Sequence, residues 1–227
     1  MLIEVIKSLF NKETVATTSK LPVWCADEDD PTPKVLNVGG NNKSIPIPAH
    51  YGSWRHLLLD ISPSDDADIV MDSRKLMDFP AQQFDAVYCS HNLEHYYQHD
   101  VKVVLSGFAH VLKPDGFAEI HVPNMRTVLK SFIDTGMEIN DVLYVSPGGP
   151  ITVHDVIYGW GKEIEESGED FYAHKTGFTE ASLMAALNAA GFVQVWTSES
   201  DDSFAIGALA FKRNPSPAQR ALLGLPA

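Results

Sequence analysis

The sequence predicts an α/β protein with one doubly wound, mostly parallel, Rossmann-like sheet. Short apolar segments alternate with helical or crossover segments through the centre of the chain, a pattern typical of parallel sheets. Several of these segments end in an acid or in a glycine turn, at the edge where such sheets bind ligands. The length of 227 residues allows one sizeable core and is short for two full domains.

Five segments before residue 123 have the composition of strands. They are residues 34–38, 56–60, 68–72, 84–89 and 117–122. Pro46 and Pro48 argue against a long helix after the first of them. Residues 92–112 are predicted to be helical, and the turn at 113–116 is expected to end that helix.

The second half continues the pattern on both sides of an irregular stretch. Residues 124–136 are predicted to form a helix, and so are residues 179–190, which begin with a capping threonine. Residues 137–178 are rich in glycine, aromatic and charged residues, so we expect an insertion over the carboxyl edge of the sheet. The closing pair of strands is predicted at residues 192–197 and 204–211.

These elements divide the chain into a lead-in, one domain and a tail. Residues 1–33 combine apolar residues at helical spacing with a polar segment, which predicts a short amphipathic helix docked on the domain edge. Residues 34–213 form the predicted domain, and residues 214–227 are expected to be a peripheral tail.

Composition and charge exclude several classes of function. The formal net charge of −13 argues against a nucleic-acid partner, because a phosphate-binding face is expected to be basic. The apolar N-terminal residues are interrupted by Glu4 and Lys7, unlike a signal peptide, and no apolar run approaches a membrane span. The two cysteines form no Cys-x-x-Cys pair. We therefore expect a cytoplasmic protein without a membrane partner.

The first candidate ligand site is the bend around Gly39 and Gly40. Glycine lets a ligand approach the backbone closely, although a plain tight turn explains the pair equally well. Asp60 ends the second strand some twenty residues later and could accept hydrogen bonds from two ribose hydroxyls. Asp72 and Ser73 end the third strand, where they could contact an adenine amino group or cap a helix.

The second candidate is the polar run at residues 90–95, directly after the fourth strand. Histidine there is a candidate general base near neutral pH. His91, His95 and His99 are spaced at i, i+4 and i+8, which on one helix face would resemble a zinc site. We expect no metal, because a His-Glu-x-x-His order is absent and the run lies where a Rossmann-like ligand loop is expected.

The segments VLNVGGNN, LLLD and FDAVYCSHNLEH…VLKPDGFAEIHVPN resemble the class I methyltransferases of the type 11 family, which use S-adenosylmethionine (SAM). The later segment HKTGFTEASLMAALNAAGF is similar to the helix and sixth strand of these enzymes, so the resemblance covers residues 34–211. It implies a seven-stranded sheet whose last strand is antiparallel. Asn37 stands where the family has an acid, and Asn41 and Lys43 stand at later glycine places. Asparagine tolerates the left-handed backbone, so the turn is expected to survive at Asn41.

The resemblance also implies a cofactor site. Its residues would be Asn37, Gly39, Gly40, Asn41, Asp60, Ile61, Asp72, Ser73, Ser90 and His91. Asp60 would hold the ribose hydroxyls, whereas Asp72 and Ser73 would approach the adenine.

The predicted reaction is direct transfer of the methyl group of SAM to an oxygen or nitrogen of a small-molecule acceptor. The cofactor carries the activated methyl, so the protein must align the reactants. His95 and His91 are the first candidate bases, and His174 is the next if the insertion folds back. The insertion is the candidate acceptor cover, with Tyr144, His154, Tyr158, Trp160 and Tyr172 as its aromatic and polar surface. Similar enzymes act in carbohydrate pathways, which suggests an acceptor of that kind.

Two alternatives stay open, as does a homodimer. The substituted glycines are compatible with a catalytically degenerate fold that binds SAM or a partner protein. An NAD-dependent oxidoreductase should show Gly-x-Gly-x-x-Gly entering a helix, and Pro46 and Pro48 oppose that reading.

Overall fold

A computed structural model describes residues 30–146, 148–200 and 204–226. Seven strands form one sheet in the order β3-β2-β1-β4-β5-β9-β8. Their bounds are β1 (Lys34–Val38), β2 (Arg55–Asp60), β3 (Ile69–Val70), β4 (Phe84–Ser90), β5 (Leu112–Pro123), β8 (Gln194–Ser200) and β9 (Ala205–Phe211). The pairs among β1 to β5 are parallel, whereas β9 runs antiparallel to both β5 and β8. The predicted sheet with an antiparallel last strand is confirmed.

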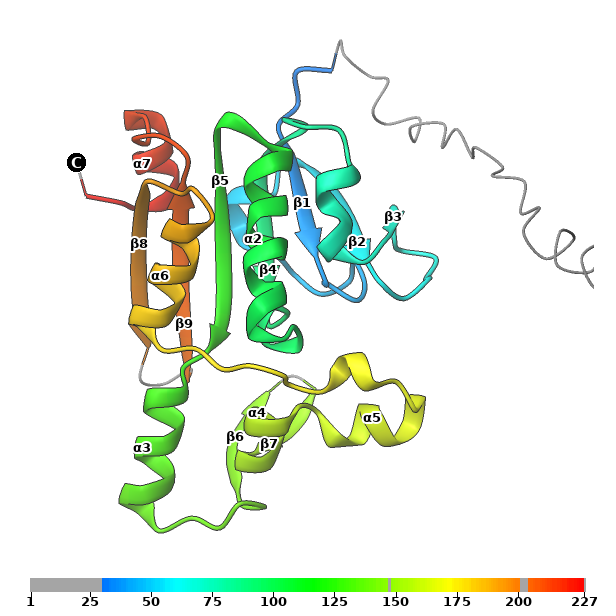
Figure 1. The fold of residues 1–227 in the computed structure, drawn as a ribbon, viewed down its shortest axis with the longest axis vertical. Helices are drawn as coiled ribbons and strands as arrows, with labels where there is room; N and C mark the ends of the chain where they lie inside the picture. Colours follow the sequence, from blue (N-terminus) through cyan, green and yellow to red (C-terminus); the bar gives the residue numbers. More distant parts are fainter. Residues whose placement is uncertain (1–29, 147, 201–203, 227) are drawn as a thin grey trace, which may run out of the picture. The chain divides into compact units, whose positions relative to one another are not determined.

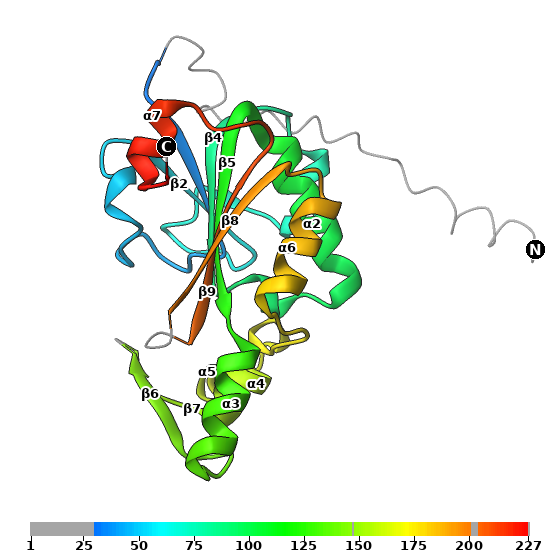
Figure 2. The same ribbon diagram turned by 90° about the vertical axis from the view of Figure 1, so that its left-hand side faces the viewer.

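Helices cover both faces of this sheet. Helix α2 (Gln98–Val111) and helix α6 (Glu180–Ala189) pack side by side on one face (Figure 2). The short helix η2 (Ala49–Tyr51) and helix α7 (Pro217–Leu223) lie on the other face. The central strands β1 and β4 are therefore buried on both sides, which explains their nearly continuous apolar sequences.

The residues after position 213, which are predicted to be a peripheral tail, contact the sheet from one side. Leu223 and Leu225 pack against a buried cluster. The cluster consists of Val35, Tyr51, Ala86, Phe117 and Phe211. The tail is short and contains two prolines, so its sequence shows no periodic pattern. Its two leucines nevertheless remove apolar area of the sheet from water.

The helix predicted at 92–112 begins only at Gln98. Residues 93–95 form the short helix η4 (Leu93–His95), and Tyr96 and Tyr97 have extended backbone. The carbonyl of Glu94 accepts hydrogen bonds from the amides of Lys175 and Thr176, at 2.8 and 3.1 Å. A tertiary contact has thus replaced the helical hydrogen bonds that the local sequence would favour.

The turn predicted at 113–116 lies within β5 instead of before it. Phe84 pairs with Leu112 and Ala86 pairs with Phe117, so the intervening residues of β5 bulge from the ladder. Lys113 Nζ lies 2.9 Å from both carboxylate oxygens of Asp85 on β4. Pairing on either side of the bulge keeps this segment in the sheet.

The two crossovers before β4 are short. Residues 39–54 contain η2 and no α-helix, as Pro46 and Pro48 predicted. After β3, the helix η3 (Ser73–Asp78) begins at Asp72, whose side chain accepts a hydrogen bond from the amide of Arg74. Strand β3 therefore ends two residues earlier than predicted.

Residues 124–178 leave the sheet at the end of β5 and return before α6. Helix α3 (Met125–Thr135) confirms the predicted helix. The insertion itself contains β6 (Val142–Ser146), β7 (Gly149–Thr152), α4 (Val153–Tyr158), α5 (Gly161–Ser167) and η5 (Asp170–Tyr172). Figure 1 shows it at the end of the sheet toward which β1 and β5 point. It lies at the carboxyl edge, as expected.

The predicted helix at 179–190 and closing strands are present. Thr179 caps α6 through the amide of Ser182, and Gly191 follows the helix with a φ of 99°. The amphipathic helix predicted within residues 1–33 lies outside the described residues. No helix in the described part of the chain is long and apolar enough to cross a bilayer.

Candidate active site

The bend after β1 is built from two residues with left-handed backbone. Gly39 has a φ of 71° and Asn41 a φ of 61°, so asparagine adopts the conformation predicted for it. The Gly39 amide donates to the Leu59 carbonyl at 2.8 Å, which ties the bend to β2. A Cβ atom on Gly39 would lie 2.1 Å from Asn92 Nδ2, so only glycine allows Asn92 to approach this closely.

Asp60 lies against this bend. One carboxylate oxygen, Oδ2, accepts a hydrogen bond from the Asn41 amide at 3.1 Å. The other, Oδ1, accepts one from the Ser62 amide at 2.9 Å. A carboxylate offers about four lone-pair sites. Asp60 can therefore still accept hydrogen bonds from two hydroxyl groups of a ligand.

A cavity of about 620 Å³ opens beside the bend. Its volume lies in the range of small-molecule sites, roughly 300–1,000 Å³. Six of the predicted cofactor residues line it: Gly39, Asn41, Asp60, Ile61, Asp72 and His91. The other four, Asn37, Gly40, Ser73 and Ser90, are not among its lining residues.

Asn37 and Gly40 lie on the side of the bend that faces away from the cavity. Asn37 is 3% exposed, and its Nδ2 lies 3.2 Å from Nε2 of His56 on β2. A Cβ atom on Gly40 would lie 2.2 Å from the same Nδ2. Burial, followed by the charge of Lys43, lowers the pKa of His56, which favours a neutral ring beside this amide. Asn37 thus supports the turn instead of facing the cavity.

The side chains of Ser73 and Ser90 contact other groups than the cavity beside the bend. The buried hydroxyl of Ser73 is hydrogen-bonded to the hydroxyl of Tyr96. Ser90 lines a second, more open cavity together with Glu119 and His121. A place at the end of a strand does not tell which way a side chain points, because successive side chains of a strand face opposite sides of the sheet.

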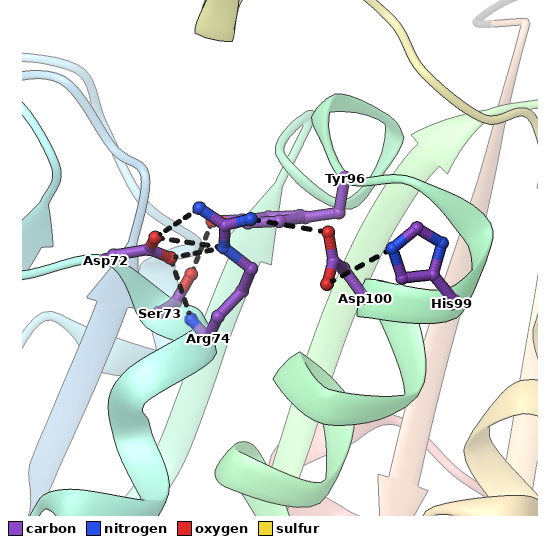
Figure 3. A network of polar contacts seen from close by, with 6 residues as sticks. All are labelled: Asp72, Ser73, Arg74, Tyr96, His99 and Asp100. Atoms are coloured by element: carbon purple, nitrogen blue, oxygen red, sulfur yellow. Dashed lines mark hydrogen bonds and ion pairs between the residues drawn. The ribbon is translucent and has the colours of Figure 1, made fainter.

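Asp72 is bound to Arg74, as Figure 3 shows. Arg74 Nη2 lies 2.6 Å from Asp72 Oδ2, and Nη1 lies 3.4 Å from Oδ2 of Asp100. Burial opposes ionisation of Asp72, but the hydrogen bonds and charge of Arg74 outweigh it and lower the pKa of the carboxyl. The three side chains all line the cavity as a fixed polar wall.

The three predicted catalytic histidines, His91, His95 and His174, all line the cavity. The rings of His95 and His174 are 4.8 Å apart between centroids. His95 Nδ1 lies 3.3 Å from the Ala173 carbonyl, and His174 Nδ1 lies 2.8 Å from the Val156 carbonyl. A carbonyl only accepts, so each Nδ1 carries the proton and Nε2 of each neutral ring keeps a lone pair.

Burial and the neighbouring His174 lower the pKa of His95, against the opposing effect of Glu94. The neutral form of the His95 ring is therefore favoured, with its lone pair available to a ligand.

Glu94 is a residue of this site to which the sequence assigned no role. It is 1% exposed, and neither carboxylate oxygen has a hydrogen-bond partner. His91 Nδ1 lies 3.5 Å from Oε1. Burial opposes ionisation, but His91, His95 and His174 together outweigh it and lower the pKa of Glu94. Its burial depends on residues 173–176, eighty positions away, so no local pattern could reveal it.

One donor atom each of Glu94, His95 and His174 lies within 4.8 Å of the others, a grouping able to hold a metal ion. The spacing of His91, His95 and His99 does not produce one helix face, since residues 91–97 are not α-helical. The His99 side chain is 80% exposed.

The insertion forms one wall of the cavity. Its lining residues are Tyr144, Ser146, Ile151, Asp155, Val156, Trp160, Glu163, Phe171, Tyr172, His174 and Lys175. Of the aromatic and polar residues expected to cover the acceptor, His154 and Tyr158 are not in this set. The cavity thus runs from the glycine bend to an aromatic surface contributed by the insertion.

Residues 38–120 match the sequence model of the methyltransferase domain family. This match over less than half of the chain, together with the order of the sheet, supports a methyltransferase domain of the class I fold. Its fold is similar to that of a SAM-dependent methyltransferase from Archaeoglobus fulgidus, with 14% identity, a TM-score of 0.50, and coverage of 79% of this chain and 86% of the other. The PH0226 protein from Pyrococcus horikoshii OT3 is similar over 85% of this chain and 87% of its own, with 13% identity and a TM-score of 0.52.

No curated protein sequence matches the chain. The methyltransferase family predicted from the sequence is confirmed, and SAM is the cofactor expected of it. The candidate cofactor residues lie at or just beyond the carboxyl ends of β1, β2, β3 and β4.

Proposed function

We propose that this methyltransferase binds SAM across the bend at Gly39 and transfers its methyl group to an oxygen or nitrogen of a small molecule held beneath the insertion. The observation that carries the proposal is the position of Asp60. Its carboxylate lies at the bend, is fixed by the Asn41 amide, and lines a cavity that continues to three histidines.

Each part of SAM finds a suitable surface. Asp60 accepts from the ribose hydroxyls, and the open backbone at Gly39 receives the methionine portion. The adenine then lies toward Ile61 and the wall formed by Asp72 and Arg74. The methyl group points toward the histidines, because they line the remaining part of the cavity.

The acceptor side is formed by the histidines and the insertion. We propose His95, and after it His91 and His174, as the groups that take the acceptor's proton. Tyr144, Trp160 and the neighbouring rings offer faces for an apolar surface of the acceptor, while Asp155 and Glu163 accept hydrogen bonds. A carbohydrate metabolite, which offers both kinds of surface, is the class of acceptor to test first.

Calorimetry tests the cofactor. SAM and S-adenosylhomocysteine should bind to the wild-type protein, and NAD should not. Asp60→Ala should weaken S-adenosylhomocysteine binding by at least about tenfold, because two hydrogen bonds to hydroxyls are worth roughly 1–3 kcal/mol. Asp65→Ala, an exposed acid five residues along, is the matched control. NAD binding in place of SAM would refute the proposal.

Release of S-adenosylhomocysteine tests the reaction. The protein should release it from SAM when incubated with hydroxyl or amine compounds, sugars and sugar nucleotides included. His95→Ala should reduce that release while S-adenosylhomocysteine affinity stays unchanged. SAM binding with no turnover on any acceptor would instead favour a catalytically degenerate fold.

A further inference from the structure

The cavity contains a group of electron-pair donors around a buried carboxylate. The Glu94 carboxylate is almost fully buried, and both of its oxygens lack a hydrogen-bond partner. A buried carboxylate without partners is costly, by roughly 1–3 kcal/mol or more. Within the described ranges its ion-pair partner is His91, at 3.5 Å. This distance is too long for a good hydrogen bond.

The two adjacent histidines add further electron-pair donors to the group. Hydrogen bonds to the carbonyls of Ala173 and Val156 place the Nδ1 of His95 and His174, so Nε2 is the nitrogen left for a ligand in each ring. Metal-ligating histidines are usually oriented in this way, by a second hydrogen bond from the other ring nitrogen to a carbonyl or carboxylate. The arrangement fixes the orientation of two imidazole rings beside a buried carboxylate.

The three side chains together form an incomplete coordination sphere. Their donor atoms lie within 4.8 Å of one another. Tetrahedral coordination with bonds of about 2.0–2.2 Å would bring such atoms to roughly 3.3–3.6 Å. Small side-chain rotations therefore suffice to close the site. His95 follows Glu94 directly in η4, and His174 is held to that loop because the amide of Lys175 bonds the Glu94 carbonyl.

We infer that Glu94, His95 and His174 bind a divalent transition-metal cation of the Zn²⁺ type in the part of the cavity that lies between the histidines and the insertion. Two imidazoles and one carboxylate favour such a cation over Mg²⁺ or Ca²⁺, which prefer oxygen ligands. Three protein ligands leave at least one coordination position open, as in catalytic zinc sites.

The open position suggests what the cation does for the reaction, and this step rests on the proposed function. All three ligands line the cavity, so an acceptor hydroxyl can reach the cation. Coordination would lower the pKa of a bound hydroxyl, whose proton would pass to His91 or to water. It would hold the oxygen in place while the bond to the methyl carbon forms and the carbon–sulfur bond of SAM breaks, which releases S-adenosylhomocysteine. His95 and His174 would then act as ligands, and the acceptor would be an alcohol or phenol and not an amine.

Metal binding can be measured without any acceptor. The tag-free full chain, first treated with a chelator, is titrated with Zn²⁺ by calorimetry and with Co²⁺ by visible absorption. We expect about one cation per chain and the ligand-field bands of a four- or five-coordinate Co²⁺ site. Glu94→Gln, His95→Ala and His174→Ala should each weaken binding by at least about tenfold. His99→Ala, on an exposed neighbouring histidine, should bind as the wild type does.

Folding and cofactor binding are measured on the same samples. Glu94→Gln keeps the shape of the side chain, and its melting temperature and S-adenosylhomocysteine affinity show whether the fold is intact. Zn²⁺ affinity that is equal in the wild type and all three ligand variants would overturn the inference, and so would wild-type protein that binds no cation. Wild-type protein that binds Zn²⁺ but not S-adenosylhomocysteine would instead contradict the proposed function.

Discussion

At the scale of single residues, close contacts behind the cavity fix its shape. Asn92 occupies the space that a side chain at position 39 would need, and Asn37 does the same at position 40. The family's acid is replaced by Asn37, whose amide pairs with His56 instead of a charged group. The altered glycine turn therefore keeps its geometry through two asparagine side chains and the left-handed Asn41.

Gly39→Ala should be more damaging than the same change at Gly136. Both glycines have positive φ, 71° and 68°, so both alanines carry the left-handed strain of about 1 kcal/mol. Position 136 is open, whereas at position 39 the new Cβ collides with Asn92. We expect a loss of about 3 kcal/mol in the free energy of unfolding for Gly39→Ala. Urea denaturation measures both, and equal losses would show that the Asn92 contact has no effect.

Glu119 gives the stability a predictable dependence on pH. Its carboxylate accepts from the Tyr51 hydroxyl at 2.8 Å and lies 2.9 Å from His50 Nε2. Burial opposes ionisation, but His121, Tyr51 and His50 outweigh it and lower the pKa of Glu119. A lowered pKa in the folded state stabilises the protein above the ordinary value of about 4.3. That contribution is lost as the pH falls through the lowered value.

Glu119→Gln should therefore destabilise the protein most near neutral pH, by about 1–2 kcal/mol. The gap between wild type and variant should begin to narrow below about pH 4.3, where Glu119 of the unfolded chain becomes protonated, and should close as the pH falls through the lowered pKa of the folded state. Urea denaturation at several pH values measures the gap, with the exposed Glu138→Gln as the control. A gap that is constant across this range would mean that ionisation of Glu119 contributes nothing.

At the scale of elements, the regular segments were predictable from the sequence and the conformation of the loop at 91–97 was not. The strands and α6 follow from apolar runs and a capping residue, which act over a few neighbouring positions. The loop at 91–97 has its conformation set by Lys175 and Thr176, which bond Glu94 from the far side of the insertion. The sequence therefore indicated correctly that the histidines lie at the carboxyl edge of the sheet. It also predicted a helix over residues 92–97, where the α-helix does not form.

Asp155 holds the two helices of the insertion in place. Its Oδ2 accepts from the amide of Thr152 at 2.9 Å in the cap of α4, and its Oδ1 accepts from the amide of Gly161 at 3.2 Å where α5 begins. Asp155→Ala removes both contacts, at a cost of about 1 kcal/mol to this region. Hydrogen exchange should become faster in residues 153–167 and stay unchanged in the sheet. Glu165→Ala, exposed on α5, should leave exchange as in the wild type, and the prediction fails if the two variants behave alike.

At the scale of the whole domain, the cavity joins the sheet edge to the insertion. Its lining includes residues from the loops after β1, β2, β3 and β4 and from most of the insertion. The segment 173–176 is the covalent and hydrogen-bonded link between the two, because it contacts η4 before the chain enters α6. A ligand that bridges the cavity must therefore stabilise both parts together, whereas α7, on the opposite face of the sheet, takes no part.

Binding of S-adenosylhomocysteine should show this coupling. At a ligand concentration of about 100 times Kd, binding stabilises the folded state by roughly 2.7 kcal/mol. Hydrogen exchange should slow at residues 39–42 and 91–97, on the sheet side of the cavity, and at 153–175 in the insertion. Exchange in α7 that proceeds by local opening should not change, which provides an internal control. Protection confined to 39–42 and 91–97 would show that the insertion does not close on the cofactor and that it responds only to the acceptor.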